Sequence, residues 1–162
     1  MTEDISIRLA EPYENQLLSE LAFRSKGYWG YSPEFMEACR AELSMSEADI
    51  SSPHIRYFLA ELEGKIVGYY AVECLSTDEY ELEALFVEPE HIGQDIGRKL
   101  IDHAKSYARS YGAQSLLIQG DPNAAKFYRA AGGIQVGERE SDSIPDRYLP
   151  EFRIFLKTED TA

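Results

Sequence analysis

The chain has 162 residues, of which 44% are hydrophobic and 28% are charged, a composition typical of a single soluble globular domain. Its formal net charge of −13, from 29 acidic and 16 basic residues, argues against nucleic-acid binding, which needs a basic face. The acidic excess favours a cationic partner through long-range attraction, although acidity also serves solubility alone.

The sequence predicts a cytoplasmic protein without membrane association. No apolar run approaches the roughly 18 residues of a membrane span, and the opening residues MTEDISIRL do not resemble a signal peptide. Cys39 and Cys74 lack CxxC or metal-ligand spacing, so we expect reduced cysteines. His54, His91 and His103 show no ligand spacing either. We therefore expect no metal and place the histidines at the surface or in loops.

Periodicity and capping residues define the first third of the chain. The apolar residues between Leu17 and Ala22 share one helical face, and Ser32 with Pro33 forms a typical helix start. The aromatic stretch GYWGYSP separates the two helices. In chain order we predict a strand over 5–9, a helix from Pro12, a helix over 33–43, and a loop or short helical turn over 44–53.

The remaining chain alternates between strand and helix patterns. Glu63-Gly64 joins two β-like runs as a hairpin turn, and apolar residues from Ile96 to Tyr111 recur at helical spacing until Gly112. Asp121 and Pro122 begin another helix as N-cap and first residue. The predicted elements are strands over 55–62, 65–75 and 80–87, a helix over 94–111, a strand over 115–119, a helix over 121–133, and strands over 132–138 and 151–157.

This order, β-α-α-β-β-β-α-β-α-β-β, predicts an α/β (α+β) fold. The sheet is expected to be mixed and mostly antiparallel, with six to seven strands and helices on both faces. A right-handed crossover makes strands 80–87 and 115–119 a central parallel βαβ unit. Residues 1–157 are predicted to form one domain, and residues 158–162 a flexible tail.

The loop HIGQDIGRKL, residues 91–100, is typical of an anion-binding strand-to-helix turn. A helix start carries unpaired amides and a partial positive charge, and glycines such as Gly93 and Gly97 let the backbone approach a phosphate. Any strand-to-helix turn can use glycine, however, so these residues alone leave phosphate binding open.

The segment LFVEPEHIGQDIGRKLIDHA, followed by DPNAAKFYRAAGG, resembles the GNAT superfamily of N-acetyltransferases. The likeness is best over residues 56–140. It implies a cytoplasmic enzyme with acetyl-CoA as cosubstrate and no metal, acting by direct transfer to a primary amine of a small molecule or peptide. A GNAT-like acyl-CoA sensor without turnover is the alternative, and the oligomeric state stays open, a homodimer included.

By position, the resemblance assigns a cofactor role to three groups of residues. The strand before the loop would pair with pantetheine, the loop amides would hold pyrophosphate, and two residues of the later helix would lie near the sulfur. These residues are Leu85, Phe86 and Val87; Gly93, Gln94, Asp95, Ile96, Gly97 and Arg98; and Asn123 and Tyr128.

The loop departs from the family pattern of Gln or Arg, two free positions, Gly, one free position, then Gly or Ala. Ile92 takes the first position and Asp95 that of the first glycine. A carboxylate about 4 Å from a phosphate charge costs on the order of 4 kcal/mol at an effective dielectric of about 20. Arg98 and Lys99 in the same first turn, or an outward-pointing Asp95 side chain, would reduce this cost. Asp95 also suits a helix start as an acidic residue.

The resemblance makes Tyr128 the acid that protonates the departing thiolate, while Phe127 is expected to be core. The base is Glu81, or less favourably Glu83, unless both are solvated strand residues. Alternation places both glutamates on the sheet face of Leu85 unless a bulge intervenes.

The acceptor is expected across the sheet, beside the loop between the first two helices. Trp29 and Tyr31 are candidates for its wall, and Arg147, in the segment SDSIPDRYLPEF, for its closure. A simple packing role is the alternative for Trp29.

Overall fold

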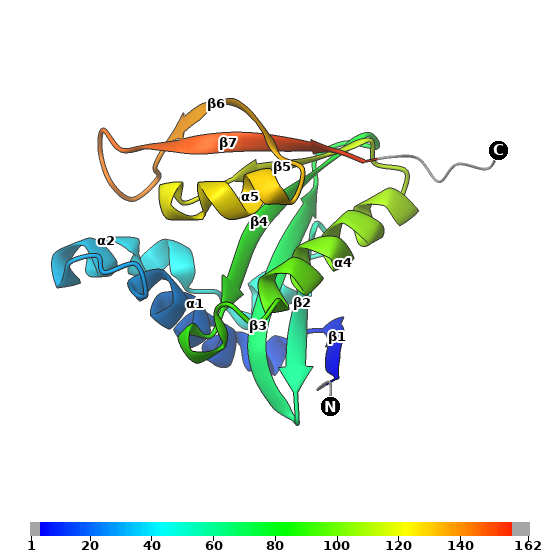
Figure 1. Ribbon diagram of the computed structural model, residues 1–162. Coiled ribbons are helices and arrows are strands. Elements are labelled where there is room, and N and C mark those ends of the chain that lie inside the picture. The colour runs from blue at the N-terminus through cyan, green and yellow to red at the C-terminus, as the bar shows by residue number, and fades with distance from the viewer. Residues whose placement is uncertain (1–3, 157–162) are drawn as a thin grey trace.

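The predicted strands assemble into one seven-stranded mixed sheet (Figure 1). The computed structural model describes residues 4–156, so the tail predicted at 158–162 lies outside the described residues. The strand order is β1-β2-β3-β4-β5-β7-β6, antiparallel except for the parallel pair β4–β5. The strands are β1 (Ile5–Leu9), β2 (Ile55–Leu62), β3 (Lys65–Cys74), β4 (Glu79–Val87), β5 (Ser115–Gln119), β6 (Ile134–Glu140) and β7 (Tyr148–Phe155).

Helices cover both faces of this sheet, as predicted (Figure 1). One face packs against α1, α2 and α3, and the other against α4 and α5. None of the helices described is long and apolar enough to span a membrane. The helices are α1 (Asn15–Gly27), α2 (Pro33–Leu43), α3 (Glu47–Ser51), α4 (Ile96–Ser110) and α5 (Ala125–Ala130), with 3-10 turns η1 (Pro12–Glu14), η2 (Pro89–His91) and η3 (Pro122–Ala124).

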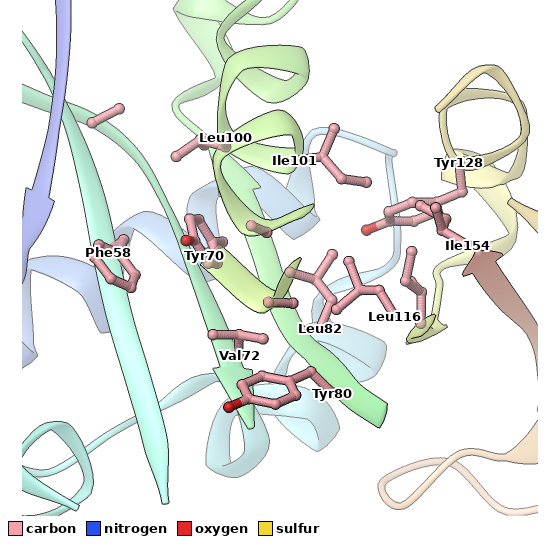
Figure 2. Packing of buried hydrophobic residues seen from close by; sticks show 14 of the residues in the cluster. Phe58, Tyr70, Val72, Tyr80, Leu82, Leu100, Ile101, Leu116, Tyr128 and Ile154 are labelled. Atoms are coloured by element: carbon pink, nitrogen blue, oxygen red, sulfur yellow. The ribbon is translucent and has the colours of Figure 1, made fainter. Parts of the chain in front are cut away.

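The α4 face holds the larger core cluster (Figure 2). Leu100 and Ile101 of α4 are fully buried, as the helical stripe predicts. Gly68 of β3 permits this close packing, because a Cβ there would lie 3.0 Å from the Leu100 side chain and 2.9 Å from the Phe86 carbonyl oxygen. The helix therefore lies directly on the strands that lead into the glycine loop.

His103 corrects the prediction that the histidines lie at the surface or in loops. Its ring lies against Phe58, and Nδ1 is 2.7 Å from the Tyr70 hydroxyl oxygen. Position 103 flanks the buried stripe of α4, so a half-buried place follows from the 3.6-residue period. Leu17 is a second correction, because it is 55% exposed although Leu18 and Leu21 beside it are buried.

The C-terminal strands differ from the prediction in extent and place. The helix expected over 121–133 is the turn η3 followed by the short α5, and the last strand begins at Tyr148 rather than at Glu151. That strand, β7, lies between β5 and β6. Local patterns carry no information on such an insertion, because it depends on pairing between residues far apart in the chain.

Candidate active site

The parallel pair β4–β5 opens into a gap. The two strands pair only from Glu79 to Leu82. Beyond Leu82, the edge of β4 on the β5 side has no pairing strand. The Glu88 amide donates to the Val67 carbonyl at 2.9 Å. The preceding residues Leu85 and Val87 therefore direct their N–H and C=O groups to the open edge.

These two edge amides differ in their partners. The Val87 amide donates to the Ser25 hydroxyl at 3.3 Å, whereas the Leu85 amide has no acceptor within residues 4–156. Leu85 thus offers a free donor in the gap. The sequence analysis did not foresee that Ser25 of α1 would occupy the neighbouring donor.

A β-bulge overturns the alternation expected for β4. Ala71 of β3 faces Ala84, while the next residue, Val72, faces Leu82, so Glu83 is the extra residue. Leu82 and Leu85 consequently both pack on the α4 face, whereas Ala84 packs on the α1 face. Glu81 and Glu83 therefore do not project from the sheet face of Leu85. The sequence analysis expected them on that face unless a bulge intervened, and the bulge is present.

The loop between β4 and α4 forms an open cradle of backbone amides. Gly93 has a φ of +91°, and a Cβ there would meet nothing within 4 Å, so the loop is open on that side. Within residues 4–156, no acceptor is found for the backbone amides at one end of this loop. These amides belong to Gly93, Asp95, Ile96, Gly97 and Arg98. Unpaired amides at the start of a 15-residue helix suit a phosphate or pyrophosphate.

Asp95 occupies the left-handed position of this loop, with a φ of +66°. Its side chain is 67% exposed, makes no capping hydrogen bond, and lies 3.3 Å from the guanidinium of Arg98. The carboxylate therefore points toward solvent and is partly neutralised. The structure thus shows the outward direction of Asp95 and its pairing with Arg98, and both reduce the repulsion expected toward a bound phosphate.

Tyr128 lies at the opposite side of the gap. Its ring is buried against Gly120, where a Cβ would come within 2.8 Å, and against Phe152. Figure 2 shows the ring pointing away from α5 toward the side of α4. Burial, with the nearby negative charge of Asp121, raises the pKa of the phenol. Tyr128 is therefore a protonated donor at neutral pH.

Phe127 has the packing role that the sequence analysis favoured. It contacts the α4-face core, and a Cβ on Gly97 would lie 3.2 Å from its ring. The second glycine of the loop thus permits α5 to pack against the start of α4. This contact fixes the cradle relative to Tyr128, the next residue on α5.

Tyr31 joins three separate segments through its hydroxyl. The hydroxyl donates to Asp121 at 2.8 Å, and it accepts from Asn123 and Arg147, each at 2.8 Å. Burial and the hydrogen bond to Asp121 raise the pKa of Tyr31 to about 12. Lys26 adds an ion pair to Asp121 at 3.2 Å. The sequence analysis selected Tyr31, Asn123 and Arg147 for different roles, and the structure brings them together.

Asp121 is the residue of this network that the sequence analysis missed as a site residue. It was predicted as an N-cap, and its carboxylate does accept from the Asn123 amide at 2.8 Å. Burial opposes its charge, but that bond and the Tyr31 hydroxyl keep the pKa of Asp121 below its usual value. Its contact with the Tyr31 hydroxyl joins residues that are ninety positions apart, so no local sequence pattern predicts it.

Three carboxylates meet at the bulge. Oxygens of Glu73, Glu81 and Glu83 all lie within 4.8 Å of one another. Glu81 is buried and accepts from Arg139 at 3.1 Å. Burial, followed by a hydrogen bond with Glu73 and the charge of Glu81, raises the pKa of Glu83 to about 8. Glu73, on the partner strand, was not predicted, because its proximity depends on the β3–β4 register.

A cavity of about 810 Å³ connects these features. The free edge of β4, the glycine loop, Asn123 and Tyr128 line it, as do Trp29 and Glu83. The lining does not include Glu81, Tyr31 or Arg147. Asp121 does line the cavity, and Tyr31 and Arg147 contact its carboxylate. The cavity thus combines a cradle of unpaired amides, a buried phenol and a carboxylate of raised pKa.

Comparisons with known proteins agree with this geometry. Residues 53–132 match the acetyltransferase (GNAT) domain family. Over 95 residues the chain is 35% identical to the N-alpha-acetyltransferase RimI of Mycobacterium tuberculosis, a match covering 56% of this chain and 60% of that protein. The chain belongs to the GNAT superfamily of N-acetyltransferases. It matches about three fifths of the length of this GNAT relative.

Solved structures confirm the GNAT fold over nearly the whole chain. A GCN5-related N-acetyltransferase from Rhodopseudomonas palustris superimposes with a TM-score of 0.79 at 23% identity, covering 96% of this chain and 99% of that one. The PaiA N-acetyltransferase of Thermoplasma acidophilum, solved with coenzyme A, gives 0.76 at 20% identity, covering 94% and 99%. The β4–β5 gap and the amide cradle of the present GNAT chain fit such a cofactor.

Proposed function

We propose that this protein is an acetyl-CoA-dependent N-acetyltransferase that acetylates a primary amine by direct transfer in a ternary complex. The observation that carries the proposal is the arrangement around the gap: a free β4 edge, the adjacent amide cradle, and the buried Tyr128 phenol all face one cavity. A small-molecule or peptide amine would enter the same cavity from the α1 and α2 side.

The cofactor side would be held mainly by backbone groups. The amides of Gly93 and of residues 95–98 would donate to the pyrophosphate, and the open edge of β4 at Leu85 and Val87 would lie along the pantetheine arm. Asn123 donates from its side-chain nitrogen to Tyr31 and Asp121, so its side-chain oxygen is the group left to accept from the cofactor. Acetyl-CoA would supply the activated acyl group.

Two donors are placed to assist the transfer. The unpaired Leu85 amide can stabilise negative charge that develops on the carbonyl oxygen of the thioester. Tyr128 can protonate the leaving sulfur, since its raised pKa keeps it in the donor form. The C–N bond forms as the C–S bond breaks, and the nitrogen loses its proton to a base.

Glu83 is the better placed base of the two predicted glutamates. It lines the cavity, whereas Glu81 does not line it and is engaged by Arg139. A carboxylate with a pKa of about 8 accepts a proton far more readily than an ordinary glutamate. We therefore assign Glu83 the proton-accepting role and Glu81 the role of holding Arg139 beside it.

Steady-state assays with acetyl-CoA and a panel of primary amines test this function. We expect thiol release that depends on the amine, an N-acetylated product detected by mass spectrometry, and intersecting double-reciprocal plots, as a ternary complex requires. CoA binding without thiol release for any amine would instead indicate the acyl-CoA sensor. A ligand at 100 times its Kd adds about 2.7 kcal/mol of stability, so a thermal-shift titration detects binding in either case.

A further inference from the structure

Ser25 is a buried polar side chain at the open edge of β4. It belongs to the last turn of α1, is only 8% exposed, and lines the cavity. Its Oγ accepts from the Val87 amide at 3.3 Å. A side chain of α1 therefore covers one of the two amides that β4 directs toward the gap, and leaves the Leu85 amide free.

The hydroxyl proton of Ser25 is not used in this contact. A serine within a helix often donates to the carbonyl four residues earlier. Ser19 does so to Asn15 at 2.7 Å, and Ser51 to Glu47 at 2.9 Å. Within residues 4–156, the Ser25 hydroxyl donates to no carbonyl and to no side chain. Its oxygen is engaged by β4, while its proton is available to a group in the cavity.

The residues on either side of Ser25 hold α1 against both walls of the gap (Figure 1). Arg24 forms an ion pair with Glu88, the residue that follows β4. Lys26 forms one with Asp121 at 3.2 Å, at the start of the turn that leads into α5. Ser25 lies between these two ion pairs in the sequence, so its position relative to the β4 edge is fixed from both sides.

The pantetheine arm of CoA carries groups that suit this arrangement. Its two amides each have a carbonyl oxygen, which needs a donor when it leaves water. The Leu85 amide is one free donor on the edge, and two residues further on the Ser25 hydroxyl stands in place of the Val87 amide. In the chain from N–H to O–H to a carbonyl oxygen, each hydrogen bond polarises the next.

We propose that Ser25 is a cofactor-binding residue, whose hydroxyl accepts from the Val87 amide and donates to an amide carbonyl of the pantetheine arm. This proposal rests on the proposed use of acetyl-CoA. It adds a side chain of α1 to a site that is otherwise built mainly from backbone groups of β4 and the glycine loop.

Calorimetric titration of Ser25→Ala with CoA tests the proposal without any acceptor. The variant loses one donor to the arm and leaves the Val87 amide without its partner, so the Kd for CoA should rise about tenfold. 3′-Phospho-ADP, the part of CoA that lacks the arm, should bind both proteins within about twofold. Ser25→Thr keeps the hydroxyl and should retain most of the affinity.

Ser19→Ala is the matched control. Ser19 lies on the same helix, and its Oγ likewise accepts a backbone amide, that of Met45 at 2.9 Å, but Ser19 does not line the cavity. Thermal melts should show a comparable loss of stability in the two alanine variants, because each leaves one amide unpaired. Only Ser25→Ala should weaken CoA binding.

An unchanged Kd for CoA in Ser25→Ala would overturn the proposal. Tighter binding would also overturn it, because Ser25 would then compete with the arm for the Val87 amide. An equal loss of affinity for 3′-phospho-ADP would do the same, since the effect would not involve the arm. In all three cases the proposed acetyl transfer is unaffected. Failure of the unaltered protein to bind CoA would refute the proposed function itself, and the role of Ser25 with it.

Discussion

The two halves of the cavity are built in different ways. The half proposed to hold the cofactor, which we call the cofactor half, comes from consecutive elements, β4 to α5, and depends mainly on backbone amides and glycines. The other half, which we call the acceptor half, is lined by Glu42, Asp49 and Glu83. It comes from α2, α3, β3 and the bulge of β4, and depends on side chains. Backbone sites of the first kind suit a cofactor common to a family, while side-chain sites of the second kind can change with the acceptor.

The largest effect is expected from Tyr128→Phe, at the boundary of the two halves. Removing one oxygen keeps the ring packed on Gly120 and Phe152 but removes the proton donor, so kcat should fall about 100-fold or more. The Kd for CoA, measured by calorimetry, should stay within about threefold, because cradle and β4 edge are unchanged. Tyr107→Phe, another tyrosine packed on the same core, should leave kcat nearly unaltered. Unchanged turnover in Tyr128→Phe would refute its role as acid.

Glu83→Gln should have the next largest effect, and it acts on the acceptor half. We expect kcat/KM to fall about 100-fold and to lose the limb that rises with pH up to about 8. The groups that face Glu83 are Glu73, Glu81 and Arg139, and Tyr57 also lies near its charge. Glu81→Gln, the matched control, should retain that limb, since Arg139 can still donate to the amide oxygen. If only Glu81→Gln removes it, the base assignment must be reversed.

The same carboxyl makes stability depend on pH. The pKa of Glu83 is raised from 4.5 to about 8 by burial first, so the folded protein holds this proton more tightly than the unfolded chain. Its contribution to stability is complete below pH 4.5 and is lost as the pH rises through about 8. Urea unfolding at several pH values should therefore show a shallower fall over this window for Glu83→Gln. An identical fall in both proteins would contradict the raised pKa.

Tyr31→Phe is expected to have a moderate effect on the connection between the halves. The variant keeps the stacked contact with Phe35 but leaves Asp121, Asn123 and Arg147 without their common partner. The free energy of unfolding should fall by about 1–3 kcal/mol. Tyr28→Phe in the same loop, where the side chain is half exposed, is the control and should change it by less than about 0.5 kcal/mol. Equal stability of the two variants would show that the network contributes nothing.

Asp95→Gly should have the smallest effect and should strengthen the cofactor half. Glycine relieves the left-handed backbone and removes a charge near the cradle, so stability should rise and the Kd for CoA should fall about fivefold. Asp95→Asn separates these causes, because asparagine tolerates the same φ but is neutral. It should tighten CoA binding with little change in stability. Weaker binding in both variants would show that Asp95 organises the loop.

The two halves also differ in how far the sequence predicts them. The β4–α4–β5 unit, the loop glycines and the capping role of Asp121 follow from local periodicity and turn chemistry. The bulge at Glu83, the approach of Glu73, and the contact of Tyr31 with Asp121 depend on register and on packing between distant segments. Residues of the cofactor half could therefore be assigned by position, while the residues of the acceptor half could be grouped only from the three-dimensional structure. The position of β7 between β5 and β6 could not be predicted either, because it depends on pairing between distant segments.

The most direct test of the central claim, that CoA occupies the β4–β5 gap, is a titration of isotope-labelled protein with CoA followed by amide NMR shifts. We predict that the largest shifts fall on the amides that lack acceptors in the structure, those of Leu85, Gly93 and residues 95–98. Smaller shifts are expected at Asn123 and Tyr128, and almost none at Asp49. Saturating CoA that leaves the amides of Leu85 and the glycine loop unshifted would contradict the account.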